Sequence, residues 1–129
     1  MDADSSLFEL VFLSGASRGV RMRFPGMAFL GRDRGNSLAI AHPGVALLHA
    51  LITYDGQQHV LMDAGSITGT RLNGIRLTAP HPLMNGDIIS LGTCVHLVYV
   101  HSSNANVSSH QHTRYQPHPL PIRNAHIYH

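Results

Sequence analysis

The sequence predicts an all-β domain of the sandwich type. Short segments rich in β-branched and large apolar residues recur between Leu7 and Val100, and Gly, Pro, Asn or Asp bounds each of them. No segment shows the periodicity of apolar residues that is typical of an amphipathic helix, and no internal repeat occurs. The 129 residues, 43% hydrophobic and 12% charged, suffice for one domain with its own core and are too few for two comfortable ones.

The first two expected strands form a hairpin. Residues 7–13 are mainly aliphatic and aromatic, residues 14–19 are mostly turn formers, and residues 20–24 alternate apolar with charged side chains. This alternation indicates one buried and one solvent-facing side. Pro25-Gly26 then turns the chain into the next strand.

The remaining expected strands follow at turn-separated intervals and suggest a plain meander. Asp55-Gly56 is a strong hairpin signal between two of them. We interpret Cys94, which falls in the apolar pattern of the last strand, as a core residue. The five segments are 27–30, 38–40, 49–54, 58–62 and 93–100.

The composition divides the chain into a flexible N-terminus (1–6), a folded domain (7–100) and a His-rich disordered tail (101–129). The tail is rich in Ser, Asn, His, Gln and Pro, with few apolar residues to offset the entropy cost of ordering. We interpret it as a solvated tail, with metal binding by its histidines as the alternative. His110-Gln-His112 is its one close pair, and no cysteine or carboxylate in the tail completes a tetrahedral site.

Composition and charge exclude several functional classes. The formal net charge of +2 is too small to suggest nucleic-acid binding. The acidic residues are scattered singly and no nucleotide-type glycine loop occurs, so we expect neither an enzyme nor a cofactor. No apolar run approaches the ~20 residues of a membrane helix, and the acidic N-terminus differs from a secretory signal. A single cysteine cannot form an internal disulfide, which fits a reducing compartment. Together these features predict a soluble, cytoplasmic protein.

The run from Phe29 to Gly92 carries an ordered set of motifs. In sequence these are Gly31-Arg32, His49, Ser66-Ile67-Thr68-Gly69-Thr70, Asn73-Gly74 and Gly86-Asp87. This order resembles a forkhead-associated (FHA) domain over roughly residues 7 to 100. The resemblance implies a β-sandwich of about eleven short strands that binds a phosphothreonine peptide of a protein partner.

A phosphothreonine site needs a guanidinium and neutral donors, because the phosphate carries about −1.5 to −2 charges and three acceptor oxygens. The resemblance assigns the phosphate contact to Arg32, and Arg34 could add a second positive charge that Asp33 in part neutralises. The phosphopeptide-binding positions implied by the resemblance are Arg32, Arg34, Ala46, Leu47, Ile67, Thr68, Thr70 and Asn73.

Three of these positions depart from the family pattern. Ala46 stands where the family has a serine that donates to the phosphate, and Leu47 stands where Arg or Lys is frequent. Thr68 replaces the asparagine that reads the peptide main chain, and its hydroxyl has a shorter reach than an amide. We therefore expect weaker phosphate binding and poorer clamping of the peptide.

Other motif residues are expected to shape the loops. By resemblance His49 ties its loop to the neighbouring turn, and Ser66 and Thr70 should bond backbone groups locally. Asn73-Gly74 is at least as well explained by hairpin chemistry as by a ligand contact, and Asp87 has no partner that the sequence identifies. The structural positions are Gly31, His49, Ser66, Gly69, Gly74, Gly86 and Asp87.

Three functional hypotheses follow. The first is a phosphothreonine-binding module that acts as an adaptor in a Ser/Thr kinase pathway or as a secretion regulator. The second is a degenerate domain that binds a protein partner, or itself, without phosphate through the sandwich face or the apolar loop Val45–Leu48. The third is metal binding by the His-rich tail.

Overall fold

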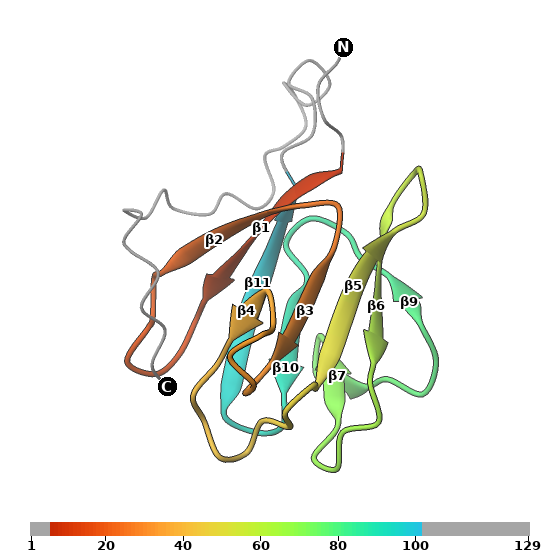
Figure 1. Ribbon diagram of the computed structural model, residues 1–129. Coiled ribbons are helices and arrows are strands. Elements are labelled where there is room, and N and C mark those ends of the chain that lie inside the picture. The colour runs from red at the N-terminus through yellow and green to blue at the C-terminus, as the bar shows by residue number, and fades with distance from the viewer. Residues whose placement is uncertain (1–5, 102–129) are drawn as a thin grey trace.

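Two antiparallel-dominated sheets pack face to face in the computed structural model, which describes residues 6–101 (Figure 1). The β-sandwich prediction is confirmed. No helix occurs in residues 6–101, and so none there has the length and apolar character to cross a membrane. The strands are β1 (Leu7–Phe12), β2 (Arg21–Pro25), β3 (Ala28–Gly31), β4 (Leu38–Ala39), β5 (Ala50–Tyr54), β6 (His59–Asp63), β7 (Thr70–Leu72), β8 (Ile75–Arg76), β9 (His81–Pro82), β10 (Ile88–Leu91) and β11 (Val95–His101).

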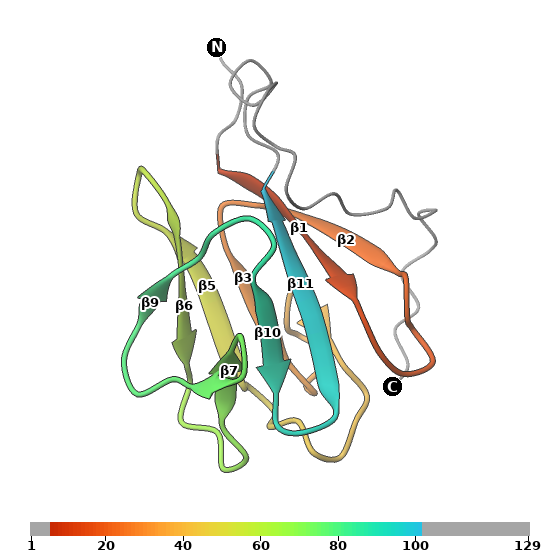
Figure 2. The ribbon, with the colours of Figure 1, turned by 180° about the vertical axis from the view of Figure 1, so that it is seen from behind.

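The strand order shows that the chain is not a plain meander. The six-stranded sheet has the order β2-β1-β11-β10-β7-β8, and the five-stranded sheet has the order β4-β3-β5-β6-β9. Figure 2 shows β11 lying between β1 and β10, so the first and last strands of the domain are neighbours. The meander prediction was wrong because the local patterns that define each strand carry no information on this long-range pairing.

The core forms where the inward faces of the two sheets meet. Phe8, Leu10 and Phe12 alternate along β1 and are almost completely buried. The outward side of the same hairpin is charged, as the alternation predicted: Glu9 accepts from Nη2 of Arg21 at 2.7 Å. This division follows from the two-residue period of a strand.

Cys94 is exposed, contrary to the prediction that it belongs to the core. The expected strand 93–100 begins two residues later, at Val95, because Gly92 takes a left-handed φ of 68° and the chain turns there. Cys94 therefore lies in the turn between β10 and β11. Residues 93 and 94 have a composition typical of a strand, so the sequence did not distinguish the turn from β11.

The other boundaries agree closely with the predictions. The Asp55-Gly56 hairpin is confirmed: Gly56 has φ 100°, and Oδ1 of Asp55 accepts from the amides of Gln57 and Gln58. β11 includes His101, whose amide donates to Oδ1 of Asn85, so the last strand extends one residue beyond its expected end at Val100. The rest of the predicted tail, with its candidate metal ligands, lies outside the described residues.

Candidate functional site

Arg32 follows β3 directly and is held against the loop between β4 and β5. Its backbone amide donates to the carbonyl of Ala46 at 2.9 Å, and its Nε donates to the carbonyl of Val45 at 3.0 Å. The terminal amino groups of the guanidinium have no hydrogen bond or ion pair within residues 6–101. They form a positioned fork with two free sets of donors, the geometry that suits a phosphate.

A close backbone approach fixes this arrangement. A Cβ atom on Gly31 would lie 2.2 Å from the carbonyl oxygen of Leu47, so only glycine fits there. Asn36 donates through Nδ2 to the carbonyls of Asp33 (3.0 Å) and Leu47 (2.7 Å). Asp33 forms no ion pair with Arg32 in the part of the chain that the structure describes. The charge of Arg32 is therefore not neutralised by its neighbour.

His49 connects the two loops from within the domain. Its ring is fully buried, Nδ1 accepts from the amide of Ala46 at 3.0 Å, and Nε2 lies 2.9 Å from the carbonyl of Gly69. Because an amide can only donate and a carbonyl can only accept, the proton is on Nε2. Both ring nitrogens are committed to loop shape.

Thr68 makes a second connection between the same loops. Its Oγ1 donates to the carbonyl of Gly44 at 3.0 Å, close to Gly92 of the β10–β11 turn. The hydroxyl thus joins loop to loop, where the resemblance implied a group that reads a peptide. Ile67, at the tip of this loop, is 91% exposed.

Three comparisons with known proteins identify the family of this chain. The family model of the FHA domain matches residues 29–92. The solution structure of an FHA domain from Arabidopsis thaliana is 31% identical, with a TM-score of 0.74 over 81% of this chain and 93% of that one. The chain belongs to the FHA-domain family.

Two further relatives are similar to this FHA domain. A solved FHA domain analysed for phosphothreonine-dependent interactions is 25% identical, with a TM-score of 0.67 over 76% of this chain and 99% of that one. An FHA domain-containing protein of Arabidopsis thaliana is 38% identical over 89 residues, which is 64% of this chain. The chain spans 23% of the length of that curated relative.

Two of the positions that depart from the family pattern, Ala46 and Leu47, give the β4–β5 loop apolar side chains. The side chains of Leu47 and Leu48 are 56% and 41% exposed, and Ala46 is half-buried with its amide used by His49. A side-chain donor to phosphate is therefore lacking at both Ala46 and Leu47.

Asp63 organises the loop between β6 and β7 (residues 64–69), which by resemblance is the second binding loop, and the sequence interpretation gave Asp63 no role. Its Oδ1 accepts from the hydroxyls of Ser66 and Thr70, both at 2.6 Å, and Oδ2 accepts from the amides of Gly65 and Ser66. Partial burial opposes ionisation, but these four bonds outweigh it and lower the pKa of Asp63 below its ordinary value. The expectation that Thr70 bonds backbone groups was wrong, because its partner is this carboxylate. The Asp-x-Gly-Ser order, a frequent aspartate turn, was the available signal.

Asn73 and Asp87 form a structural pair that joins the β7–β8 turn to the segment leading into β10. Asn73 has φ 51°, its Nδ2 donates to Oδ1 of Asp87 at 3.0 Å, and its Oδ1 accepts from the amide of Ile88 at 2.9 Å. Asp87 also accepts from the amide of Met84 at 2.8 Å, so it has two partners that the sequence did not identify. The positive φ of Asn73 and the use of both its polar side-chain atoms by Asp87 and Ile88 favour the turn interpretation over a ligand contact.

Arg76 is a cation near the site that the sequence interpretation missed. A Cβ atom on Gly69 would lie 2.7 Å from Cζ of Arg76, which places the guanidinium directly over the backbone of the second binding loop. Arg76 is exposed and makes no hydrogen bond or ion pair within residues 6–101. Its place two residues after Asn73-Gly74, on a strand that returns toward this loop, was the available signal.

A metal site finds no support in the described part of the domain. Between residues 6 and 101, no group of three His, Cys, Asp or Glu side chains is placed to hold an ion. His101, the first residue of the predicted tail, packs edge-on against His59 with ring centroids 5.3 Å apart.

Proposed function

We propose that this FHA domain binds phosphothreonine peptides of a protein partner. The observation that carries the proposal is the guanidinium of Arg32, held by the carbonyl of Val45 and free of any counter-ion in residues 6–101. Arg34 stands in the same loop and adds positive charge without an ion pair to Asp33. The phosphothreonine-dependent interactions analysed for the FHA domain that is 25% identical support phosphothreonine as the ligand.

The altered positions predict moderate affinity. Ala46 cannot donate to phosphate, and the hydroxyl of Thr68 is already bonded to Gly44. Each missing neutral hydrogen bond costs about 0.5–1.5 kcal/mol, so two of them weaken binding by roughly ten- to a hundredfold. Such a domain suits a reversible adaptor that recruits a partner after phosphorylation in Ser/Thr kinase signalling or in secretion control. Because protein kinases use intracellular ATP, the proposal places it in the cytoplasm.

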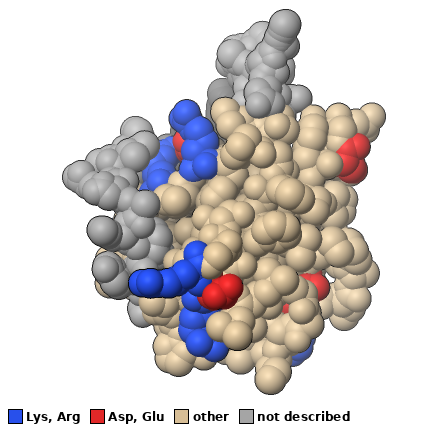
Figure 3. All heavy atoms as spheres, viewed as in Figure 1, with Lys and Arg blue, Asp and Glu red and all other residues tan. Residues whose placement is uncertain are grey.

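A second candidate is phosphate-independent binding of a protein partner, and an uncharged apolar surface favours it. Phe29, Leu51 and Met62 stand in one row across the outer face of the five-stranded sheet. Figure 3 shows that the centre of the face seen there carries no Lys, Arg, Asp or Glu, the charged residues lying toward its edges. The exposed Leu47 and Leu48 add apolar surface at the end of the sandwich that carries loops β3–β4, β4–β5 and β6–β7, called the loop end below.

One titration separates the two candidates. A phosphothreonine peptide library, its unphosphorylated twin and a phosphoserine version are titrated against wild type and Arg32→Ala, with Arg18→Ala on the β1–β2 turn as the control. We expect selective phosphothreonine binding that Arg32→Ala weakens by at least about tenfold and Arg18→Ala leaves unchanged. Ala46→Ser should raise the affinity by about tenfold, because it restores a donor. Equal binding of all three libraries, unaffected by Arg32→Ala and lost in Leu47→Ser/Leu48→Ser, would favour the second candidate.

A further inference from the structure

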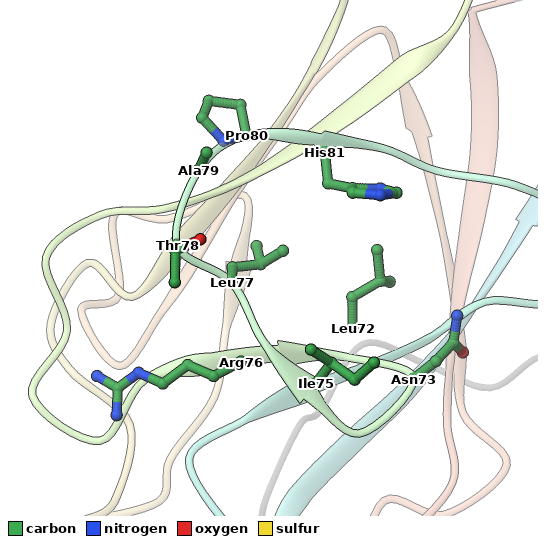
Figure 4. A pocket seen from close by; sticks show the side chains of 9 residues that line it. All are labelled: Leu72, Asn73, Ile75, Arg76, Leu77, Thr78, Ala79, Pro80 and His81. Carbon is green, nitrogen blue, oxygen red and sulfur yellow. The ribbon is translucent and has the colours of Figure 1, made fainter.

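A hollow lies beside the loop end, on the edge of the six-stranded sheet. Its volume is about 370 Å³, and the β7–β8 hairpin and the segment leading into β9 form its walls (Figure 4). Figure 4 shows the side chains of Leu72 and Leu77 pointing into this space, with Ile75 below and His81 above. The lining residues are Leu72, Asn73, Ile75, Arg76, Leu77, Thr78, Ala79, Pro80 and His81, and no acidic residue is among them.

The lining gives the hollow the character of an apolar subsite. Leu72 forms its buried floor at 7% exposure, whereas Ile75 on the rim is 73% exposed. An aliphatic side chain entering from a partner would cover mainly the exposed surface of Ile75 and pack against Leu72, and the burial of apolar surface is the main favourable term in association. The polar atoms of the Asn73 side chain are bonded to Asp87 and to the amide of Ile88 and do not oppose this.

Arg76 links the hollow to the proposed phosphothreonine site. It lines one end of the hollow, and its guanidinium lies over Gly69 of the second binding loop. In the β7–β8 register it stands directly opposite Arg71, and neither arginine has an ion-pair partner within residues 6–101. Like charges in opposed positions destabilise a strand pair, and an anionic partner group would relieve this repulsion.

We propose that the hollow is a second anchoring site for the same peptide, taking an aliphatic side chain, while Arg76 pairs with an acidic residue between that side chain and the phosphothreonine. This inference rests on the proposed function. The charge of Arg76 and the hollow's continuity with the loop end identify the occupant as an acidic and aliphatic peptide segment.

The test is peptide selection by the full chain. A phosphothreonine library with randomised flanking positions and its unphosphorylated twin are selected with wild type, Ile75→Ser and Arg76→Gln. Met84→Ser and Arg18→Gln are the matched surface controls, since Met84 is 71% exposed and neither residue lines the hollow. Circular dichroism checks that each variant is folded. All four residues are exposed, so folding should be unaffected.

We expect wild type to enrich an aliphatic residue at one position and an acidic residue between it and the phosphothreonine. Ile75→Ser should abolish the aliphatic preference, and Arg76→Gln should abolish the acidic one. Each substitution should lower the affinity for the selected peptide by about tenfold without removing phosphothreonine dependence. The controls should keep both preferences.

The outcomes separate this inference from the proposed function. Phosphothreonine binding with no flanking preference, or with preferences that survive both variants, would refute the hollow as a peptide-anchoring site and leave the proposed function standing. Selection of the same aliphatic and acidic pair from both libraries, lost in Ile75→Ser and Arg76→Gln, would support the hollow and overturn phosphothreonine dependence. Binding of no library peptide would overturn both.

Discussion

At the residue scale, one carboxylate holds the shape of a binding loop. Asp63 ends β6 and receives two hydroxyl and two amide hydrogen bonds from residues 65–70. Ser66 in turn accepts from the amide of Gly69 at 3.0 Å. The loop that carries Thr68 is therefore built around Asp63, whose two carboxylate oxygens both accept hydrogen bonds from within this segment.

Asp63→Asn should lower the free energy of unfolding at pH 7 by about 1–3 kcal/mol, because an amide is a weaker acceptor than a carboxylate. The hydrogen bonds keep the folded-state pKa of Asp63 below its ordinary value of 3.8. The stabilisation is therefore complete above pH 3.8 and is lost as the pH falls through the folded-state pKa. Urea unfolding of wild type and variant between pH 7 and pH 2.5 measures this difference.

Asp33→Asn is the control for this measurement, since Asp33 is exposed and has no ion pair within residues 6–101. Its curve should follow that of wild type. A wild-type advantage over Asp63→Asn that stays constant down to pH 2.5 would refute a role for the ionised carboxylate.

At the element scale, the loops at one end of the sandwich act as a unit. Loop β3–β4 contacts loop β4–β5 through Asn36 and Arg32, and loop β4–β5 contacts loop β6–β7 through His49 and Thr68. The position of Arg32 therefore depends on backbone contacts made by residues far from it in the sequence.

Gly31→Ala should disrupt this unit. The new methyl group would lie 2.2 Å from the carbonyl oxygen of Leu47 and 2.8 Å from Nδ2 of Asn36, so loop β3–β4 must move. We expect a loss of about 1–3 kcal/mol in the free energy of unfolding, as is typical of overpacking, together with weaker phosphopeptide binding because Arg32 is displaced. Chemical denaturation and peptide titration measure the two effects.

Gly35→Ala is the matched control in the same loop. Its Cβ would meet nothing closer than Oδ2 of Asp33 at 3.4 Å, an ordinary contact that should change stability little. Equal effects of the two substitutions would show that the close approach at Gly31 does not position Arg32.

At the scale of the whole molecule, a buried histidine joins the two sheets to the start of the chain. His59 on β6 accepts through Nδ1 from the hydroxyl of Tyr99 on β11 at 2.5 Å, and its Nε2 donates to the carbonyl of Ser6 at 2.8 Å. Burial lowers the pKa of His59, the Ser6 carbonyl works against this, and nearby His101 lowers the pKa further. Burial also raises the pKa of the Tyr99 hydroxyl. The folded protein therefore favours the neutral form of the His59 ring.

This histidine should make the domain sensitive to mild acid. The unfolded chain takes up a proton on His59 near pH 6.5 and the folded chain resists it, so the stabilisation is complete above pH 6.5 and is lost as the pH falls through the folded-state pKa. His59→Gln should lower stability at pH 7.5 and flatten its decline between pH 7 and 5. Urea unfolding across this range is the measurement, with the exposed His81→Gln as the control. An unchanged pH dependence in His59→Gln would assign the acid sensitivity to other groups.

Local chemistry made most of the fold predictable. The Asp55-Gly56 hairpin, the charged face of the first hairpin and the positive φ at Asn73-Gly74 follow from short-range turn and strand preferences. The placement of Arg32 directly after a strand ending in glycine was equally visible in the sequence.

Features that depend on contacts between distant segments were missed. The exposure of Cys94, the partners of Asp87 and the position of Arg76 over Gly69 all require knowing which strands and turns meet in space. The hydrogen bond from Thr68 to the carbonyl of Gly44 was missed for the same reason, because the two residues lie 24 positions apart in the sequence.

The sequence by itself determined the β-sandwich, the family and the candidate guanidinium of the phosphate site, since turn chemistry, apolar periodicity and motif order are local properties of the chain. The tertiary structure alone decided that β11 lies between β1 and β10, that Asp63 organises the second loop, and that Arg76 connects this loop to an apolar hollow. The physical reason is that such pairings are selected by the burial and hydrogen bonding of the whole assembled sandwich, which no short window of sequence contains.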